Sequence, residues 1–390
     1  MAYTVWPTGS VGSAANEALV KESVGDLISN LFPLETPLQA TLGKMPMNNV
    51  ETYQPIDTFS SSLINRVSSV FGSSGATSLT TSAQAEGSSP TDYTAQYPAK
   101  LKSIAEIQLK SFTVSGTDRA MSMYGIADRY AYEALKVTQA LANMFEHSFW
   151  WSPGTATAGA DLDSAGGTTY YARQTQGLVH WICKSGLQRS KIGLAQASFT
   201  DAHGNEFGTN SPALNTGASA WAYDAGGISL DKNMFKEQLM AQWYAITGRQ
   251  GGAVGFTGGR IKNMFSEFAL TANGAINDRT LDAASKLIVD TVDYYETDYG
   301  VVSLNLCRYL NIASQSVAIG YGPSSATTTI PYDEVLLFIQ PRYFKIGVVR
   351  PIHLEALAKT GDFERGQVVG EMGLVCTNPQ AGSAIVNCVP

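Results

Sequence analysis

Apolar residues recur at helical spacing near the start of the chain. A helix is expected over residues 18–32, and Pro33 ends it because proline cannot continue the hydrogen-bond ladder. Its apolar face comprises Val20, Val24, Leu27, Ile28 and Leu31. A second, short helix is expected to begin at Pro37 with Thr36 as its N-cap. The apolar face of that helix comprises Leu38, Leu42 and Met45.

A polar stretch over residues 52–99 separates two strand-like flanks. It holds four charges, and residues 67–90 are mostly Ser, Thr, Gly and Ala, so a flexible linker is one interpretation. The flanks, residues 56–70 and 93–114, are rich in β-branched and aromatic residues. The alternating positions are Ile107, Leu109, Phe112 and Val114. We therefore favour a long hairpin that projects from the body and needs a neighbour to be stable.

The clearest helical pattern covers residues 126–149, a length of roughly 35 Å at 1.5 Å per residue. Its stripe comprises Ile126, Tyr130, Ala134, Val137, Leu141, Phe145 and Ser148. The charged residues that fall largely off this stripe are Asp128, Arg129, Glu133, Lys136 and Glu146. Trp150, Trp151 and Pro153 are expected to end the helix. A helix of this length more often supports a sheet than carries catalytic residues.

The rest of the chain alternates loop-rich and regular segments. Residues 152–230 favour irregular loops and short strands, and a helix is expected from Asp231, its N-cap, to residue 247. A glycine-rich loop over 248–259 and a helix over 261–269 follow. The last third is expected to be β-rich, with strands at 287–297, 301–306, 335–339, 344–349, 368–377 and 384–389. A turn at residues 298–300 joins the first two of these strands.

Composition and charge exclude several classes of protein function. The chain has 390 residues, a net charge of −7 and only 15% charged residues, against the ~25% usual for soluble domains. The sequence has no cluster of Lys and Arg of the kind that binds nucleic-acid phosphates. No apolar run reaches the ~20 residues of a membrane-spanning helix. Residues 1–11 lack the charged and apolar regions of a secretory signal. So small a fraction of charged residues indicates either that copies of the chain bury much of the surface or that parts of the chain are flexible and polar.

Residue types that commonly carry chemistry are present without the spacing that chemistry needs. The glycine-rich run at 248–262 lacks a phosphate-loop motif and is expected to follow a helix rather than a strand. The histidines form no metal motif; they are His147, His180, His203 and His353. A carboxylate group that could hold a hard cation comprises Asp293, Glu296 and Asp298, and a charged hairpin tip is the plainer interpretation. We expect no catalytic, cofactor-binding or metal-binding residue.

The four cysteines lie far apart in the sequence and form no C-x-x-C motif. They are Cys183, Cys307, Cys376 and Cys388. Reduced thiols in a chain made in a cytoplasm are the simplest expectation, while a disulfide between Cys376 and Cys388 on adjacent strands stays open.

Several segments together resemble the major capsid (major head) protein family of tailed bacteriophages. They are "LFPLETPLQATLGK" (31–44), the run from 112 to 147, "VDYYETDYGVVSL" (292–304), and the run from 335 to 382 with its "RP…LAKTGD" segment. The resemblance implies the Hong-Kong-97-like capsid fold, an α+β fold with an N-terminal arm, an extended hairpin loop, a peripheral domain with a long spine helix, and an axial domain.

The expected domains follow this order. They are the arm (1–50), the hairpin loop (51–110), the peripheral domain with the spine helix (111–154), a loop-rich insertion in the axial domain (155–230), the axial domain (231–344) and the return to the peripheral domain (345–390). The best candidates for charge pairs at subunit contacts are Arg350, Lys359, Asp362 and Glu371. Ordinary surface charges are an equal alternative for these four.

The family also implies a function and partners. Many copies would close into pentamers and hexamers of an icosahedral virion head that encloses double-stranded DNA without reading its sequence, and assembly would take place in the host bacterial cytoplasm. Decoration or cement, scaffolding and portal proteins are further partners that the family allows, and no membrane is expected. The alternatives are the shell of a cellular nanocompartment with the same fold, a phage tail or decoration protein, and, from another class, a hydrolase that uses Asp298 or Cys307.

Overall fold

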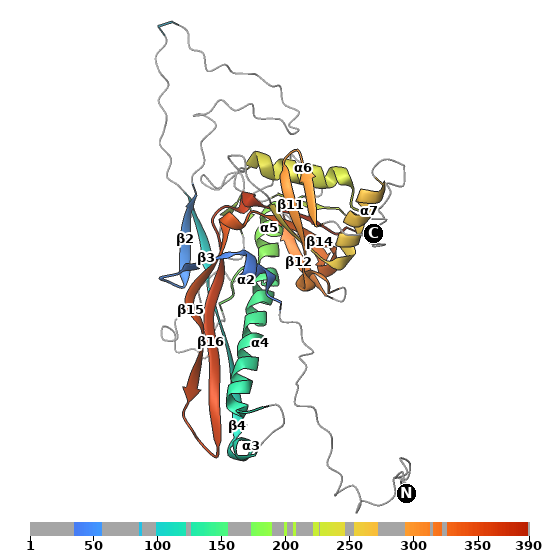
Figure 1. The fold of residues 1–390 in the computed structure, drawn as a ribbon. Coiled ribbons are helices and arrows are strands. Elements are labelled where there is room, and N and C mark those ends of the chain that lie inside the picture. The colour runs from blue at the N-terminus through green and yellow to red at the C-terminus, as the bar shows by residue number, and fades with distance from the viewer. Residues whose placement is uncertain are drawn as a thin grey trace, which may run out of the picture.

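The computed structural model describes residues 35–56, 86–87, 99–121, 126–154, 173–188, 199–200, 206–207, 221–225, 227–245, 253–271, 293–312, 315–321 and 326–388. The helix expected over residues 18–32 and nearly all of the polar tip at 67–90 lie outside this part of the chain. Within it, the structure has an elongated part built on a long helix and a broader part built on a second sheet (Figure 1).

A four-stranded sheet with the order β1-β15-β16-β4 forms the elongated, peripheral part. Its strands are β1 (Gly43–Pro46), β4 (Glu106–Ser115), β15 (Phe344–Leu357) and β16 (Phe363–Cys376). Strands β15 and β16 form a long antiparallel hairpin, and β1 joins β15 in parallel. The strands predicted at 344–349 and 368–377 are therefore confirmed. Both are longer than predicted on the side of their shared turn, because β15 and β16 continue to pair with each other beyond the apolar residues.

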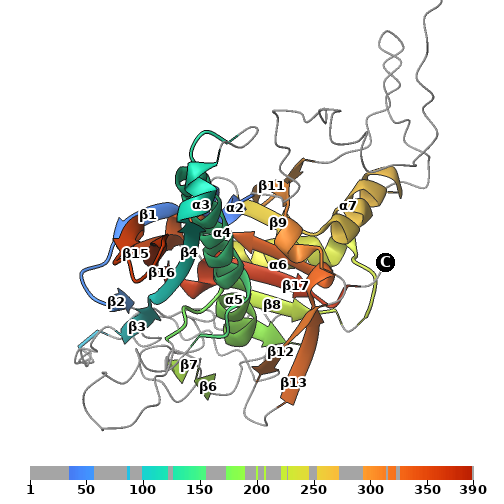
Figure 2. The same cartoon turned by 90° about the horizontal axis from the view of Figure 1, so that it is seen from below.

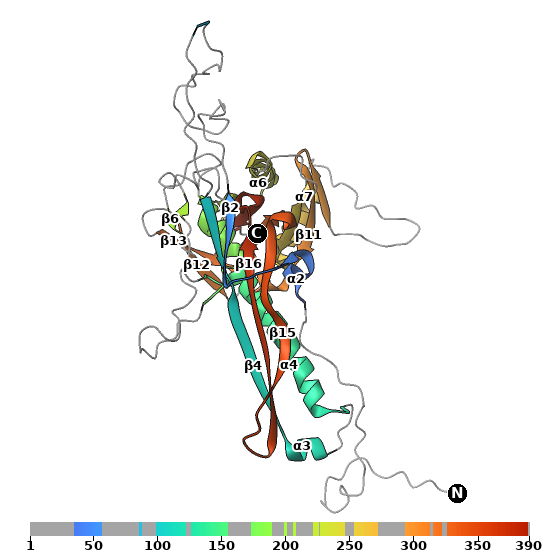
Figure 3. The same ribbon diagram turned by 90° about the vertical axis from the view of Figure 1, so that its left-hand side faces the viewer.

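The predicted spine helix is α4 (Arg129–Trp151), which lies along one face of this sheet (Figure 3). The Asp128 side chain accepts a hydrogen bond from the Tyr130 backbone N–H and caps the helix. Glycines on β16 let the helix approach closely: a Cβ at Gly366 would lie 2.6 Å from the Tyr130 hydroxyl and from the Phe112 ring. The expected core stripe is confirmed at Ala134, Leu141 and Phe145, which are buried.

A short helix precedes one edge strand of the peripheral sheet, β1, and another follows the opposite edge strand, β4. The expected N-terminal helix is α2 (Pro37–Thr41); the Thr36 side chain forms no capping hydrogen bond, and Met45 lies on β1 instead of continuing the helix. Helix α3 (Gly116–Ala120) follows β4, with Ser115 as its N-cap. Strands β2 (Glu51–Ile56) and β3 (Ala99–Ile104) pair in antiparallel register and form the base of the predicted hairpin.

The axial part is a seven-stranded sheet with the order β10-β11-β9-β14-β17-β8-β5. The strands are β5 (Leu187–Gln188), β8 (Trp221–Asp224), β9 (Ala253–Thr257), β10 (Tyr294–Thr297), β11 (Gly300–Leu306), β14 (Val335–Ile339) and β17 (Gly382–Val386). Viewed along the spine helix, the peripheral strands lie on one side of α4 and this sheet on the other (Figure 2). Smaller elements are the pairs β6 (Phe199–Thr200) with β7 (Glu206–Phe207) and β12 (Ser316–Tyr321) with β13 (Ala326–Pro331), and the 3₁₀ turns η1 (Arg308–Leu310), η2 (Tyr332–Glu334), η3 (Pro341–Tyr343) and η4 (Pro379–Ala381).

Helices cover both faces of the axial sheet, which makes it a central layer. Alternate residues of β14 face opposite ways: Leu336 and Phe338 join a core with α6 (Lys232–Ala245) and α7 (Gly259–Thr271), and Leu337 joins the core of α4 and α5 (Leu178–Gly186). A strand buried on both faces reads as a continuous apolar run, which is why β14 was predicted correctly. The core of α4 and α5 also takes in Leu38 of α2 and Val368 of the peripheral sheet, so it runs through both parts of the molecule.

Two expectations for this region are wrong. Residues 178–186 form α5 rather than loops or strands, and their buried residues include Val179 and Trp181. Residues 253–257 of the expected glycine-rich loop form the buried strand β9, which lies between α6 and α7, while the run itself follows the helix α6 as expected. In both cases a short apolar run stands among glycines and small polar residues. The strand partners of β9, which are β11 and β14, lie far along the chain. The domain boundaries, including the insertion at 155–230, stay predictions.

Candidate assembly surface

The far end of the peripheral sheet brings two of the candidate residues together with α3. Lys359 and Asp362 lie in the exposed turn between β15 and β16. The Lys359 amine lies 2.7 Å from the Glu364 carboxylate, and Arg119 of α3 pairs with the same carboxylate. The Asp362 backbone carbonyl accepts a hydrogen bond from the Gly116 N–H at 3.2 Å. The turn is thereby attached to α3, and its charged side chains face outward at the tip of the molecule.

The other two candidates lie opposite each other on the sheet. Arg350 of β15 and Glu371 of β16 are register partners, and the Arg350 Nε donates to a Glu371 oxygen at 3.0 Å. Arg173 pairs with the second Glu371 oxygen. The Glu371 carboxylate is buried, while the Arg350 side chain is 46% exposed. Within one chain, Glu371 is therefore engaged on both oxygens, and Arg350 still presents donors at the surface.

The sheet face turned away from α4 carries apolar and titratable side chains. Ile107 and Leu109 of β4 are 41% and 58% exposed. Across the sheet, the His353 Nε2 lies 2.8 Å from a Glu355 oxygen, and Gln367 donates to the other oxygen at 2.6 Å. The Pro351 carbonyl and Glu355 raise the pKa of His353, and the hydrogen bond from Gln367 lowers the pKa of Glu355. Exposed apolar residues beside ordered charges are typical of a surface that binds another protein.

The base of the projecting hairpin is held by polar contacts at its surface. The Lys102 amine lies 2.7 Å from one Glu51 oxygen, and the Tyr53 hydroxyl donates to the other at 2.8 Å. This hydrogen bond and burial both raise the pKa of Tyr53. Strands β2 and β3 lie side by side at the edge of the body, and Ile56 and Ala99 are register partners at one end of this pair (Figure 1).

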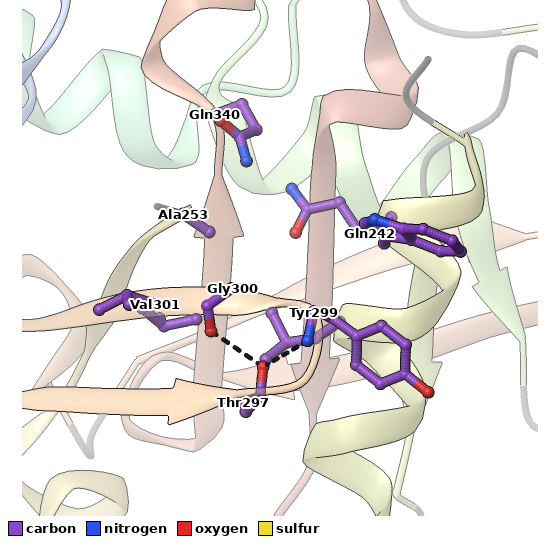
Figure 4. Close-up of a pocket in the computed structure, with 10 residues that line it drawn as sticks. Gln242, Ala253, Thr297, Tyr299, Gly300, Val301 and Gln340 are labelled. Carbon is purple, nitrogen blue, oxygen red and sulfur yellow. Dashed lines mark hydrogen bonds between the residues drawn. The ribbon is translucent and has the colours of Figure 1, made fainter. Parts of the chain in front are cut away.

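The edge of the axial sheet also exposes apolar surface. The turn expected at residues 298–300 joins β10 to β11, and Gly300 has a φ of 134°, a conformation that favours glycine. A shallow pocket lies between this turn and α6, lined among others by Trp243, Thr297 and Tyr299 (Figure 4). The Thr297 hydroxyl donates to the Gly300 carbonyl at 3.0 Å, which holds the turn closed. Tyr294 on the edge strand is 73% exposed.

Chemistry other than binding finds little support among the described residues. No group of three His, Cys, Asp or Glu side chains there is placed to hold a metal, and Asp293 pairs with Lys262 at 2.9 Å. All four cysteines are buried and none is in a disulfide, and burial raises the pKa of Cys307 to about 12, which keeps it a thiol. His203 lies outside the described part. Within that part, no helix is long and apolar enough to cross a membrane.

Sequence reasoning missed two buried carboxylates. Glu146, expected off the core stripe of the spine helix, is fully buried, and Glu106 of β4 is 5% exposed. Both accept hydrogen bonds from distant backbone N–H groups, Glu146 from Leu38 and Glu106 from Thr175. Burial raises the pKa of each. For Glu146, the sequence shows only a glutamate at the apolar C-terminal end of a helix, which does not identify the groups that donate hydrogen bonds to it.

Comparisons with known proteins agree with this architecture. No curated protein matches the chain. Among solved structures, the capsid of an empty GTA particle aligns with a TM-score of 0.53 at 10% identity over 98% of this chain and 100% of that one. The capsid of cyanophage P-SCSP1u gives 0.52 at 12% identity over 98% of each chain, and Gordonia phage Cozz gives 0.51 at 11% over 99% of each. These likenesses confirm the expected Hong-Kong-97-like capsid fold.

The sequence itself carries the assignment further than the fold does. A family model described as the SU10 major capsid protein matches residues 7–388, which is almost the entire chain. The match includes residues 155–230, which the resemblance read from the sequence did not cover. The chain therefore belongs to the SU10 major capsid protein family.

Proposed function

We propose that copies of this chain assemble, in pentamers and hexamers, into the icosahedral head of a tailed bacteriophage and enclose its packaged double-stranded DNA. The family match carries the capsid assignment. The DNA, the arrangement of subunits and assembly in the host cytoplasm are the proposed part. A net charge of −7 suits a wall that confines DNA without holding its phosphates. Decoration, scaffolding and portal proteins are proposed as further partners.

The geometry supports a self-associating role. The hairpin base, the outer face of the peripheral sheet and the tip of the β15–β16 hairpin each present side chains that one chain leaves exposed. They lie on different sides of an elongated body, as heterologous contacts between copies require if those contacts are to close into rings. We propose that Lys359, Asp362 and Arg350 lie at or near such contacts, with Glu371 holding Arg350 in place.

Expression of the full chain, followed by negative-stain microscopy and nuclease treatment, tests the assignment. The expressed chain is expected to form closed particles, and particles purified from infected cells are expected to protect double-stranded DNA from the nuclease. Particles filled with cargo protein would favour a nanocompartment, hollow tubes would favour a tail protein, and a stable monomer absent from virions would refute the proposal. Loss of an assayable hydrolase activity in Cys307→Ser would support an enzyme, and the raised pKa of that buried thiol argues against it.

The projecting hairpin gives a sharper experiment. Deletion of residues 67–90 is expected to leave a soluble chain with an unchanged melting temperature, because both strands of the base, β2 and β3, stay intact. The same deletion is expected to block shell formation, since the removed residues would contact a neighbour. Normal assembly of the deletion variant, with unchanged particle stability, would contradict the assignment of this hairpin.

A further inference from the structure

Glu146 lies near the C-terminal end of the spine helix and is fully buried. Its carboxylate faces the first turn of α2, more than one hundred residues earlier in the sequence. Oxygen Oε1 accepts hydrogen bonds from the Leu38 backbone N–H at 2.6 Å and from the Trp150 indole at 3.1 Å. Oxygen Oε2 accepts from the Gln39 backbone N–H at 3.2 Å. A buried charge with three donors around it is satisfied in a way that a lone carboxylate is not.

These hydrogen bonds cap the N-terminus of α2. The first N–H groups of a helix have no partner inside it, and a side chain just before the helix normally accepts from them. Here the Thr36 side chain makes no such bond, and Pro37 has no N–H to offer. Glu146 therefore caps α2 from a different element. A carboxylate presents acceptors only, whereas a glutamine would turn an N–H group toward one of these donors.

Further contacts attach the same segment to the axial part. The Arg308 Nε donates to a Glu35 oxygen at 3.1 Å, and the Tyr309 hydroxyl donates to the Glu35 carbonyl at 3.2 Å. The Gln39 side chain donates to the Ala142 carbonyl at 2.9 Å. The segment 35–42 thus touches both the spine helix and η1, and Figure 3 shows α2 beside α4 and β15. The segment 35–42, which leads into β1, is therefore held by both parts of the molecule.

We propose that Glu146 is a positioning residue for shell assembly: it fixes the segment 35–42 at the junction of the spine helix and η1, and with it the edge strand β1, which begins at Gly43 and presents exposed residues to a neighbouring copy. This inference rests on the proposed assembly of the shell. A buried ionic group often costs stability, and a role in specifying one arrangement explains why such a group is kept. Apolar contacts of Leu38 alone would hold α2 against the core without fixing its direction.

The test compares two buried carboxylates of the same chain. Glu146→Gln keeps the size of the side chain and loses one acceptor, and Glu106→Gln makes the same change at a residue that contacts Gln108 and Thr175 and not α2. Hydrogen exchange of the full-length protein is followed at the Leu38 and Gln39 amides, and particle yield is followed by negative-stain microscopy. Glu146→Asp, which retains the charge at a shorter reach, is included as the conservative variant.

In Glu146→Gln we expect these two amides to exchange at least tenfold faster, with unchanged exchange in β4, and the yield of closed particles to fall several-fold. Glu146→Asp is expected to restore part of the yield, and Glu106→Gln to assemble like the wild type. Protected amides, normal particles despite released amides, or an equal loss in Glu106→Gln would each overturn the proposal.

Two further comparisons distinguish a defect in this segment from misfolding and from failure of the proposed function. If Glu146→Gln does not fold, Gln39→Ala combined with Arg308→Ala loosens the same segment through surface residues. That variant should then show the same defects at smaller size, and normal assembly with released amides would overturn the proposal. Failure of the wild-type chain to form shells would refute the proposed function itself and is separate from these outcomes.

Discussion

Trp151 stacks on Tyr332 with ring centroids 3.5 Å apart and ring planes 4° apart. Trp151 is the last residue of the spine helix, and Tyr332 begins η2 next to the axial strand β14. The Trp151 indole also donates to the Tyr309 carbonyl at 2.9 Å. This contact joins the peripheral and axial parts where the helix ends.

Trp151→Ala is expected to lower the free energy of unfolding by about 3–5 kcal/mol, because it empties a buried site and removes the stacking partner of Tyr332. Urea denaturation followed by circular dichroism measures the loss. Trp151→Phe should lose less, since a ring remains, and Trp243→Ala should lose less still, because Trp243 is 45% exposed. Equal losses in Trp151→Ala and Trp243→Ala would show that the stack does not couple the two parts.

Gly366→Ala is expected to destabilise the chain by about 1–3 kcal/mol through overpacking. The new Cβ would lie 2.6 Å from the Phe112 ring and the Tyr130 hydroxyl, so α4 or β4 must move. Gly43→Ala is the control, because a Cβ there meets nothing within 4 Å. Thermal melts of the two variants compare them directly, and a Gly366→Ala protein as stable as Gly43→Ala would mean that the sheet and the helix can separate at low cost.

The sequence predicted the elements whose own pattern is long or strongly periodic. The spine helix, β14 and the β10–β11 turn were predicted from local spacing alone, because an apolar stripe or a glycine with positive φ acts within a few residues. The prediction failed for β9, whose strand partners lie far along the chain, and for α5, whose short apolar run lies within a stretch rich in Gly, Ser and Thr. The cap of α2 is the same case, since its acceptor lies on another helix.

The surface could be predicted only in part. Arg350 and Glu371 were predicted as candidates for charge pairs at subunit contacts, but their pairing with each other within one chain depends on register shifts between residues 348 and 353 that no local pattern shows. Arg173, the second partner of Glu371, comes from a segment that was expected to be a loop-rich insertion. The contacts of a shell protein lie on other copies, so one sequence indicates exposed apolar residues such as Leu109 without naming their partners.

Stability should fall between mildly acidic and neutral pH because of Glu106 and Glu146. Burial raises the pKa of both above the ordinary value of 4.5, so the folded chain binds these protons more tightly than the unfolded chain. Their contribution is fully present below 4.5 and is lost as the pH rises through the raised pKa. Groups near Glu146 that also respond to its charge are Cys307 and Tyr309.

Glu106→Gln is therefore expected to flatten the pH dependence of the urea midpoint between pH 4.5 and neutral pH. Glu364→Gln provides a contrast of opposite sign, because the hydrogen bond from Lys359 and the charge of Arg119 lower the pKa of Glu364. Its contribution is present above the unfolded pKa and is lost as the pH falls. A Glu106→Gln curve that parallels the wild type would mean that water reaches this carboxylate.

Glu371→Ala is expected to cost about 3–5 kcal/mol, because it leaves the partly buried Arg173 without its counter-ion. Arg350→Ala should cost about 1 kcal/mol or less, since its side chain is 46% exposed and solvent replaces much of what the pair provides. A double-mutant cycle between Arg350 and Glu371, measured by urea denaturation, isolates their coupling. The two effects are expected to separate in assembly: Arg350→Ala should fold normally and form fewer particles, because its exposed guanidinium is then missing at a proposed contact. Normal particle yield in Arg350→Ala, with a large coupling energy, would instead assign the pair to the stability of a single chain.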